Sequence, residues 1–370
     1  MMIPLSQPDI GEKERKAVLD VLKTPCLALG PKLTEFEEKF SRYIGTKYAV
    51  AVNSGTSGLH LIVRALGIGR EDEVITSPFS FIASANCILF ENAKPVFVDI
   101  DPDTLNIDAG KIEKAITDRT KAIVAVDILG HPLDWDRVTK VARKNKLKII
   151  EDSCEAFGAE YRGRKCGTFG EASVFAFYPN KQMTTGEGGM ILTDSREIKD
   201  LCSSMANQGR KVENGKWLEH VRLGYNYRMC DINAALGIAQ LSRINDMFKK
   251  RDRVAKLYDK YLGGVDGVSV PYVAPWAKIS WFVYVIRLSG KYVRKDRDRI
   301  MEKLKDAGIQ CSNYFQCIHL QPFYKDLYGY KRGDFPIAEN ISDHTVALPF
   351  YNNLSEDKIK YVVKSLKRII

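Results

Sequence analysis

The chain has 370 residues, of which 45% are apolar and 28% are charged, and its formal net charge is +10 at pH 7. This length suits about two domains with sizeable cores, and the composition excludes an intrinsically disordered chain. No apolar run approaches the roughly 18 residues that a membrane span needs. The opening stretch, "MMIPLSQPDIGEKERK", has no apolar signal core, so we expect a cytoplasmic protein.

Charge and cysteine spacing narrow the possible partners. Lys and Arg are spread along the chain and alternate with acids in stretches such as "DRVTKVARKNK", which favours solvated helix faces over a nucleic-acid or membrane surface. A phosphate-bearing substrate is compatible with this charge. None of the eight cysteines forms a C-x-x-C pair, and the histidines lack zinc spacing. We therefore expect reduced, structural thiols and no metal site.

Short apolar runs alternate with helical patterns along the first two-thirds of the chain. The predicted strands are 48–54, 72–78, 94–100, 120–128 and 147–153, and the helices between them are 56–67, 80–92, 108–116 and 133–145. Such alternation is typical of βαβ units and predicts a mostly parallel sheet with helices on both faces. Two more strands are predicted at 172–178 and 188–193.

The pattern changes in the last third of the chain. Apolar residues recur at helical spacing over 230–262, which predicts one long helix. A strand at 281–289 and helices at 294–306 and 355–369 then predict a smaller α+β unit. We assign residues 1–248 to a large domain and 249–370 to a small C-terminal domain, joined by the long helix.

Candidate functional residues stand at the predicted strand ends, where ligands bind in doubly wound sheets. "NSGTSG" follows the first strand, and there Thr56 and Ser57 begin a helix whose unpaired amides favour a phosphate; a plain helix cap is the alternative. Asp152 ends the fifth strand, where a buried carboxylate needs a cation or a strong donor unless it caps a helix. Asp127 ends the fourth strand, and we expect a sheet-end or loop role for it.

Lys181 stands between two apolar runs in "FAFYPNKQMTTGEGGMILT". Desolvation neutralises a buried amine, and a neutral amine can form a Schiff base with a carbonyl; a lysine that reaches out to solvent is the alternative. The lysine precedes the glycines, which excludes a Walker-type phosphate loop, and Thr184 and Thr185 are expected to fix the turn. A phosphate cradle, a strand-end Asp and a strand-end Lys together match the needs of pyridoxal 5′-phosphate.

The motifs resemble those of a known family. "NSGTSGLHL", "SPFSFIASAN", "IIEDSCEAFGA", "FYPNKQMTTGEGG" and "GYNYRMCDINAALGIAQL" look like the DegT group of sugar aminotransferases, and the similarity runs from "PLSQPDI" to "ALPFYNNLS". This resemblance implies a fold-type I pyridoxal-phosphate enzyme. It implies amino transfer from L-glutamate, released as 2-oxoglutarate, to a UDP- or dTDP-linked ketosugar for aminosugar, surface polysaccharide or glycoside biosynthesis. It also implies a homodimer with sites at the interface.

The resemblance assigns roles to single residues of the cofactor site. Lys181 falls at the Schiff-base lysine, Asp152 at the partner of the pyridine nitrogen, Thr56 and Ser57 at the phosphate cradle, Phe81 at the ring that stacks on the cofactor, Glu155 near its phenolic oxygen, and Asn226 at an asparagine that reaches the phosphate of the neighbouring subunit. The family often has His or Gln at position 155, and often Ser where this chain has Ala176. The protonation of Glu155 and the details of the phosphate cradle are therefore open.

Three further residues are candidates for the substrate. Arg210 can meet a diphosphate because guanidinium suits phosphate geometry, although a surface arginine is the alternative. Tyr314 and His319 lie in "SNYFQCIHLQPFY", which matches a family segment near the substrate; a structural histidine is the alternative for His319.

Two other functions stay open. One is a different fold-type I reaction, such as that of a desulfurase or aldolase, against which "YNYRM" and "IHLQP" argue. The other is a non-catalytic regulator or sensor that binds the cofactor. Relatives with His in place of the lysine perform dehydration, so Lys181 favours amino transfer.

Overall fold

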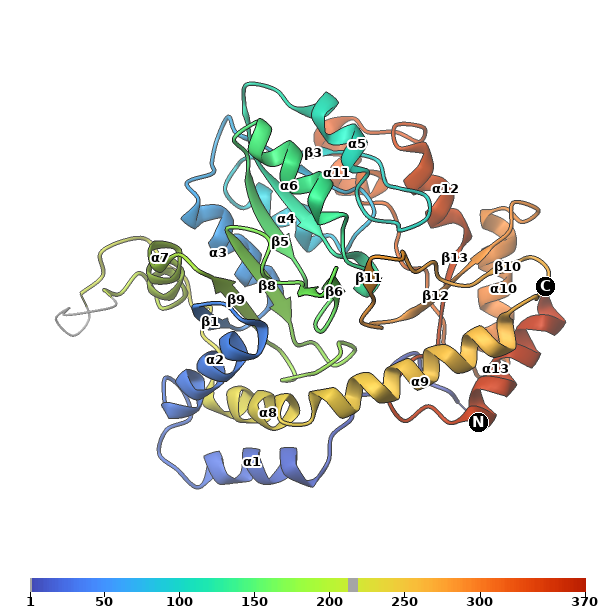
Figure 1. Cartoon of the computed structure of the whole chain (residues 1–370), viewed down its shortest axis with the longest axis horizontal. Helices are drawn as coiled ribbons and strands as arrows, with labels where there is room; N and C mark the ends of the chain where they lie inside the picture. The colour runs from blue at the N-terminus through green and yellow to red at the C-terminus, as the bar shows by residue number, and fades with distance from the viewer. Residues whose placement is uncertain (1, 212–218) are drawn as a thin grey trace.

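A seven-stranded sheet forms the centre of the larger part of the molecule in the computed structural model, which describes residues 2–211 and 219–370 (Figure 1). Its order is β1-β9-β8-β5-β4-β2-β3, and only β9 runs antiparallel to its neighbours. The strands are β1 (Tyr48–Val52), β2 (Glu73–Thr76), β3 (Lys94–Phe97), β4 (Thr120–Val126), β5 (Lys148–Asp152), β8 (Ala172–Ala176) and β9 (Gly189–Thr193). The predicted mostly parallel α/β sheet is confirmed.

Helices cover both faces of this sheet, which explains why its strands read as continuous apolar runs. One face packs against α3 (Gly55–Ala65), α4 (Ala83–Leu89) and α7 (Arg196–Ala206). The other packs against α2 (Pro31–Ile44), α5 (Ala109–Ile112), α6 (Trp135–Lys144) and α8 (Asp231–Leu241). Gly58 lets α3 approach closely, since a Cβ there would lie 2.9 Å from Cγ1 of Val174.

The predicted long helix over 230–262 is wrong in one respect, because two helices occupy it. α8 ends at Leu241 and α9 (Ile244–Leu262) begins after a break at Ser242 and Arg243. Arg243 leaves the helical conformation, with φ −125° and ψ 16°, and its guanidinium bonds Asp9 and Glu14 of the N-terminal segment. Those partners also connect the α8–α9 junction to α1 (Glu12–Leu22), which lies along α8.

A three-stranded antiparallel sheet organises the smaller part, with the order β10 (Val268–Ser269), β12 (Tyr284–Leu288) and β13 (Thr345–Leu348). Helices α9, α10 (Arg294–Asp306) and α13 (Glu356–Ile369) enclose its core. Ile3 is buried in this core and bridges to Ile309, so the first residues pack with the last third of the chain. Both termini lie on this side of the molecule (Figure 1).

The segment between α10 and β13 returns to the larger part. It contains α11 (Pro322–Tyr328) and α12 (Pro336–His344), whose apolar residues pack against Phe79, Phe97 and Ile100. A third small sheet joins β6 (Glu160–Tyr161) and β7 (Arg164–Lys165) to β11 (Ala277–Lys278). These contacts hold the C-terminal third against the edge of the central sheet where the strands end.

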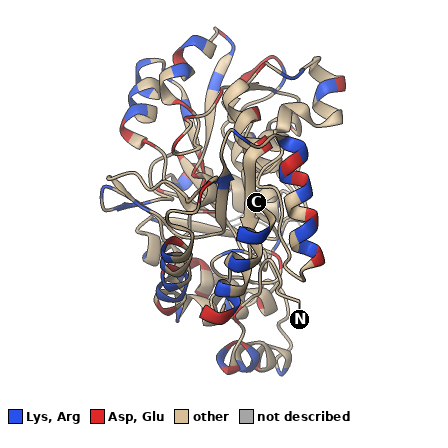
Figure 2. Ribbon diagram, turned by 90° about the vertical axis from the view of Figure 1, so that its right-hand side faces the viewer, with Lys and Arg blue, Asp and Glu red and all other residues tan. Residues whose placement is uncertain are grey.

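The positive charge is not spread evenly along the chain, contrary to the sequence-based expectation. Residues 1–248 contain 33 Lys and Arg against 33 Asp and Glu, whereas residues 249–370 contain 23 against 13. The whole net charge of +10 thus comes from the C-terminal third. Figure 2 shows Lys and Arg along the helix that ends at the C-terminus. Within the part of the chain that is described, no helix is long and apolar enough to cross a membrane.

Candidate active site

A cavity of about 480 Å³ lies at the carboxyl edge of the central sheet, against the returning C-terminal segment. Its walls come from the β1–α3 turn, the loop after β2, the ends of β4 and β5, the loop after β8, and two separate segments of the smaller part. Residues from these elements that line it include Ser54, Thr56, Phe81, Asp152, Glu155, Lys181, Phe282 and Tyr314. Five of the ten predicted site residues therefore line the same cavity as Lys181.

The N-terminus of α3 forms one end of the cavity. Thr56 lines it, whereas Ser57 is buried behind the turn, where its hydroxyl donates to Oδ1 of Asn53 at 2.6 Å. The helix cap is Ser54, whose Oγ accepts from the amide of Ser57 at 3.1 Å. A first helical turn that faces a cavity suits an anion.

Asp152 lies at the end of β5 and is buried. Its Oδ2 accepts from Oγ of Ser84 at 2.7 Å, and its Oδ1 accepts from the amide of Cys154 at 3.2 Å. No helix follows it, which excludes the helix-cap alternative. Among the described residues, no Lys, Arg or His lies within ion-pair distance of this carboxylate. A buried carboxylate without a cation is costly, so the site suits a ligand that brings a cationic N–H.

Lys181 points into the cavity and not out to solvent, as only 13% of its side chain is exposed. Its Nζ lies 3.5 Å from Oε1 of Glu155 and 4.0 Å from the centre of the Phe282 ring. Its backbone is fixed as well, because the carbonyl accepts from the buried guanidinium of Arg251 at 3.0 Å. Burial lowers the pKa of Arg251 to about 10.

The turn after Lys181 has the predicted threonine contacts. Oγ1 of Thr184 donates to the carbonyl of Phe177 at 2.8 Å and accepts from the amide of Gly186 at 2.9 Å. Oγ1 of Thr185 donates to the carbonyl of Glu187 at 2.6 Å.

Two groups beside Lys181 have raised pKa values. Burial raises the pKa of Glu155 and the charge of Asp152 adds to this, while Lys181 and the amide of Leu129 act in the opposite direction. Burial, and then the charge of Glu155, raise the pKa of Tyr314 to about 12. The Tyr314 hydroxyl accepts from Nδ2 of Asn180 at 3.3 Å, so it is a neutral group at the cavity wall.

Besides Ser57, three predicted site residues lie outside the cavity. His319 is fully buried, with Nε2 at 3.0 Å from Oε1 of Glu339 and its ring against Phe335, so the structural alternative holds for it. Arg210 pairs with His220 by a backbone bridge, next to residues outside the described range. Asn226 is exposed, and its carbonyl accepts from Nδ2 of Asn53 at 3.4 Å.

Several residues of the site were missed by the sequence analysis. Ser54 was overlooked beside Thr56, although Ser is a preferred cap residue. Ser84 and Phe282 gave no signal, because they reach the site from distant parts of the chain. Arg251 lies in the basic run "KKRDR" of the predicted long helix, where no local signal sets it apart, yet it is buried.

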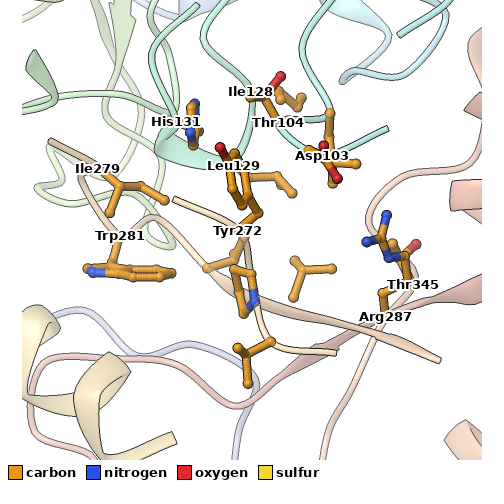
Figure 3. A pocket seen from close by; sticks show the side chains of 15 residues that line it. Asp103, Thr104, Ile128, Leu129, His131, Tyr272, Ile279, Trp281, Arg287 and Thr345 are labelled. Atoms are coloured by element: carbon orange, nitrogen blue, oxygen red, sulfur yellow. The ribbon is translucent and has the colours of Figure 1, made fainter. Parts of the chain in front are cut away.

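A second cavity, of about 50 Å³, is lined in part by Ile128 and Leu129 of the Ile128–Gly130 turn (Figure 3). His131, Tyr272, Trp281 and Arg287 line it. Both of its basic side chains have partners: Nε2 of His131 accepts from the amide of Ala274 at 3.2 Å, and Arg287 donates to the carbonyl of Pro102 at 2.7 Å. This cavity is a packing gap between the two parts of the molecule.

Asp127, Glu151 and Cys166 form a fully buried cluster beneath the site, within ligand distance of one another. Both carboxylates already accept hydrogen bonds, and Oγ of Ser153 bridges them at 2.8 and 3.0 Å. Burial and then the charge of Glu151 raise the pKa of Asp127 well above its usual range. The cluster therefore joins β4 to β5, in agreement with a sheet-end role for Asp127.

Residues 8–367 match the DegT/DnrJ/EryC1/StrS aminotransferase family. The chain belongs to this family. It is 39% identical to the spore coat polysaccharide biosynthesis protein SpsC of Bacillus subtilis, over 100% of this chain and 97% of that protein. It is 38% identical to the GDP-perosamine synthase of Caulobacter vibrioides, over 100% and 98%. The PMP-form of the putative sugar aminotransferase Spr1654 of Streptococcus pneumoniae superimposes with a TM-score of 0.95, at 29% identity over 99% and 98%.

As a member of the family, this sugar aminotransferase uses pyridoxal 5′-phosphate. The residues present fit this cofactor. The first turn of α3 suits its phosphate, Asp152 offers a buried carboxylate that lacks a cation, and Lys181 places an amine in the same cavity. The exposed ring of Phe81 also lines the cavity and offers a stacking surface.

Proposed function

We propose that the enzyme transfers the amino group of L-glutamate to the keto group of a nucleotide-linked sugar. The observation that carries this proposal is the meeting of the α3 N-terminus, Asp152 and Lys181 in one cavity, in a chain that matches a sugar aminotransferase family over residues 8–367. UDP- and dTDP-linked sugars are candidate acceptors. Similarity to a relative named GDP-perosamine synthase adds GDP-linked sugars.

The chain's own groups divide the work as follows. Bound pyridoxal 5′-phosphate supplies an electron-withdrawing ring that stabilises negative charge on the carbon that loses a proton. Lys181 holds the cofactor between turnovers and, once displaced, moves the proton at the substrate carbon. Asp152, oriented by Ser84, offers its carboxylate to the ring nitrogen. Such proton transfer contributes typically about 10²–10⁴-fold to the rate.

The acceptor sugar is proposed to enter between the two parts of the chain. Tyr178 and Asn180 of the larger part and Tyr314 and Phe315 of the smaller part line the cavity together. The side-chain amide of Asn180 and the hydroxyl of Tyr314 are hydrogen-bonded to each other. Both polar groups can instead bind hydroxyls of a sugar. Tyr314 therefore stays in the proposed substrate site.

Two further properties belong to this proposal. A homodimer with shared sites is supported by exposed apolar side chains near Asn226, namely Val221 (46%) and Leu223 (68%), and by Phe81 at the cavity (58%). A cytoplasmic location is supported by the eight free cysteines, since reduced thiols suit a reducing compartment. The name of SpsC supports a role in polysaccharide biosynthesis.

The test separates the two half-reactions. Glutamate should bleach the visible band of the holoenzyme and yield 2-oxoglutarate. The resulting amino form should then convert at least one of a panel of GDP-, UDP- and dTDP-linked ketosugars into an aminosugar, followed by mass spectrometry. If glutamate reacts but no ketosugar on the panel does, the acceptor assignment fails. If neither half-reaction occurs, the cofactor-bound sensor is favoured.

A further inference from the structure

Glu155 and Lys181 form a buried pair of opposite charge at the centre of the site. Oε1 of Glu155 lies 3.5 Å from Nζ, and the side chains are 6% and 13% exposed. The other carboxylate oxygen, Oε2, accepts from the amide of Leu129 at 2.9 Å, which leaves Oε1 to face the amine.

Contacts with Ser280 fix the backbone around both Glu155 and Lys181. Nε2 of Gln182, the residue after the lysine, donates to the carbonyl of Glu155 at 2.6 Å and to that of Ser280 at 3.2 Å. The turn that holds Oε2 is fixed against Ser280 as well: a Cβ on Gly130, at φ +86°, would lie 1.9 Å from the Ser280 carbonyl oxygen. The distance between Nζ and Oε1 is thus set by the packing around the site.

We propose that the Glu155 carboxylate holds the ammonium form of Lys181 while Nζ carries the proton that it takes from the substrate carbon. The N–H bond made when Nζ takes the proton is broken when Nζ returns it, so no proton is consumed and no further reactant is needed. Burial raises the pKa of Glu155, but the charge of Lys181 and the amide of Leu129 act against this and favour the ionised carboxylate, which stabilises the positive charge. This inference rests on the proposed role of Lys181 as the cofactor-binding lysine.

Stabilising the ammonium of Lys181 requires a charged residue at position 155. A glutamine has the same shape and can accept the Leu129 amide, but it carries no charge. An ammonium buried beside Phe282 has little water to solvate it, so a carboxylate at 3.5 Å is its main source of stabilisation. Glu155 therefore gives this chain a charged partner for the lysine where many relatives have His or Gln.

Three other titratable side chains interact electrostatically with Glu155 or Lys181. Asp152 approaches from β5, Cys154 from the loop after it, and Tyr314 from the smaller part. Burial raises the pKa of the Cys154 thiol well above its usual range and that of Tyr314 to about 12, so both stay neutral near pH 7. A change in the behaviour of Lys181 on loss of the Glu155 charge can then be ascribed to that charge.

The test uses full-length protein freed of cofactor. The rate at which an acylating reagent labels Nζ of Lys181 is measured against pH by mass spectrometry of its peptide, because only the neutral amine reacts. In Glu155→Gln, the loss of the carboxylate should make labelling near pH 7 faster by about tenfold or more. Glu155→Asp keeps the negative charge but moves it farther from Nζ. Its labelling rate should lie between the rates of wild type and Glu155→Gln.

The matched control is Glu187→Gln, which removes one negative charge from the same cavity wall. Its labelling curve should coincide with the wild-type curve, and thermal melts should show all variants folded. Glutamate-driven bleaching of reconstituted Glu155→Gln should be slower than that of wild type. Equal labelling in Glu155→Gln and wild type overturns the proposal, and so does an equal shift in the control. Labelling requires neither cofactor nor sugar. If no ketosugar proves to be the amino acceptor, the result of the labelling test is therefore unaffected.

Discussion

The amine of Lys181 is buried without being isolated. The ring face of Phe282 and the carboxylate of Glu155 replace water around Nζ, and Arg251 fixes the backbone from the opposite side. A cation over an aromatic ring gains about 1–2 kcal/mol when it is partly desolvated. The side chain therefore keeps one position while its chemistry changes.

Lys181→Ala should remove the covalent link to the cofactor. Purified wild-type protein is expected to be yellow, and borohydride should fix the cofactor to one peptide, which contains Lys181. The variant should lose both this reducible bond and all turnover, because we propose that one amine serves as the attachment point and the proton carrier. A borohydride-fixed cofactor on the variant would place the nucleophile on another residue.

Asp152→Asn keeps the shape of the side chain and removes its charge. We expect the variant to bind cofactor in near-normal amount, since the phosphate end of the cavity is untouched. Both half-reactions should slow by at least about tenfold, because each unit of lost proton coupling at the ring nitrogen is worth about 1.4 kcal/mol. Stopped-flow absorbance with glutamate measures this, and Ser84→Ala, which keeps the charge, should show a smaller loss. Unchanged rates in Asp152→Asn would assign the ring nitrogen to another partner.

How much of the site could be predicted depended on local sequence context. Asp152 ends the apolar strand β5, and Lys181 comes in the loop shortly after the apolar strand β8, so their place at the sheet edge was predictable. Ser84 bonds Asp152 across 68 positions of sequence, and no local pattern reports such a contact. For His319 the resemblance indicated a segment but not a direction, and its side chain turns towards Glu339.

At the scale of elements, the edge of the central sheet at β1 is partly closed by α2. Oε1 of Glu37, on α2, accepts from the amide of Ala51 in β1 at 2.8 Å. Burial raises the pKa of Glu37 to about 7, against the opposing effects of this hydrogen bond and of Lys199. An edge strand with free amides is a template for unwanted pairing, so this contact protects the sheet.

Glu37→Gln should make stability less dependent on pH. The folded-state pKa lies above the unfolded value, so the wild-type carboxyl loses stability as pH rises from about 4.5 to about 7, and the loss is complete above that range. The variant should match wild type near pH 4 and be more stable above pH 7, by on the order of 1–3 kcal/mol. Urea unfolding at several pH values measures this. Glu302→Gln, at an exposed position on α10, is the control, and a Glu37→Gln variant no more stable at high pH than wild type would contradict the expectation.

Most elements were predictable because their signals are local. β1, β5 and α13 fall inside the expected ranges, since continuous apolar runs and helical spacing each reflect nearby residues. The break between α8 and α9 was not predictable, because Arg243 leaves the helix to bond Asp9, 234 residues away. Local propensity favours one helix there, and the distant ion pair overrides it.

At the scale of the whole molecule, a part with no net charge and a part with a positive net charge meet at the cavity. The first 248 residues have no net charge, and the remainder carries all of it. Arg251 joins them, because its guanidinium donates to the carbonyls of Lys181, Trp281 and Phe282. The site is therefore assembled only when both parts are in place, which suits a reaction that needs water excluded.

The proposal of a dimer with shared sites depends on the position of Asn226. The segment around it runs beside the end of β1, with the amide of Asn53 donating to the carbonyl of Tyr227 at 2.8 Å and a bridge between Val52 and Arg228. The cap residue of α8 is Cys230, so Asn226 does not cap that helix. Its exposed position next to the α3 turn leaves it available to a second copy of the chain. In a two-fold dimer, such a residue would be exchanged reciprocally between sites.

Mixing two inactive variants tests this exchange. Lys181→Ala and Asn226→Ala chains, the second first shown to be nearly inactive alone, are mixed under conditions that exchange subunits. If Asn226 acts across the interface, each heterodimer has one doubly damaged site and one intact site, with Lys181 from one chain and Asn226 from the other. Activity should then return towards half of the wild-type value per heterodimer. If Asn226 serves its own chain, every site has one lesion and mixing restores nothing. Heterodimers verified by native mass spectrometry that stay inactive would reject the shared site while leaving the cofactor assignment intact.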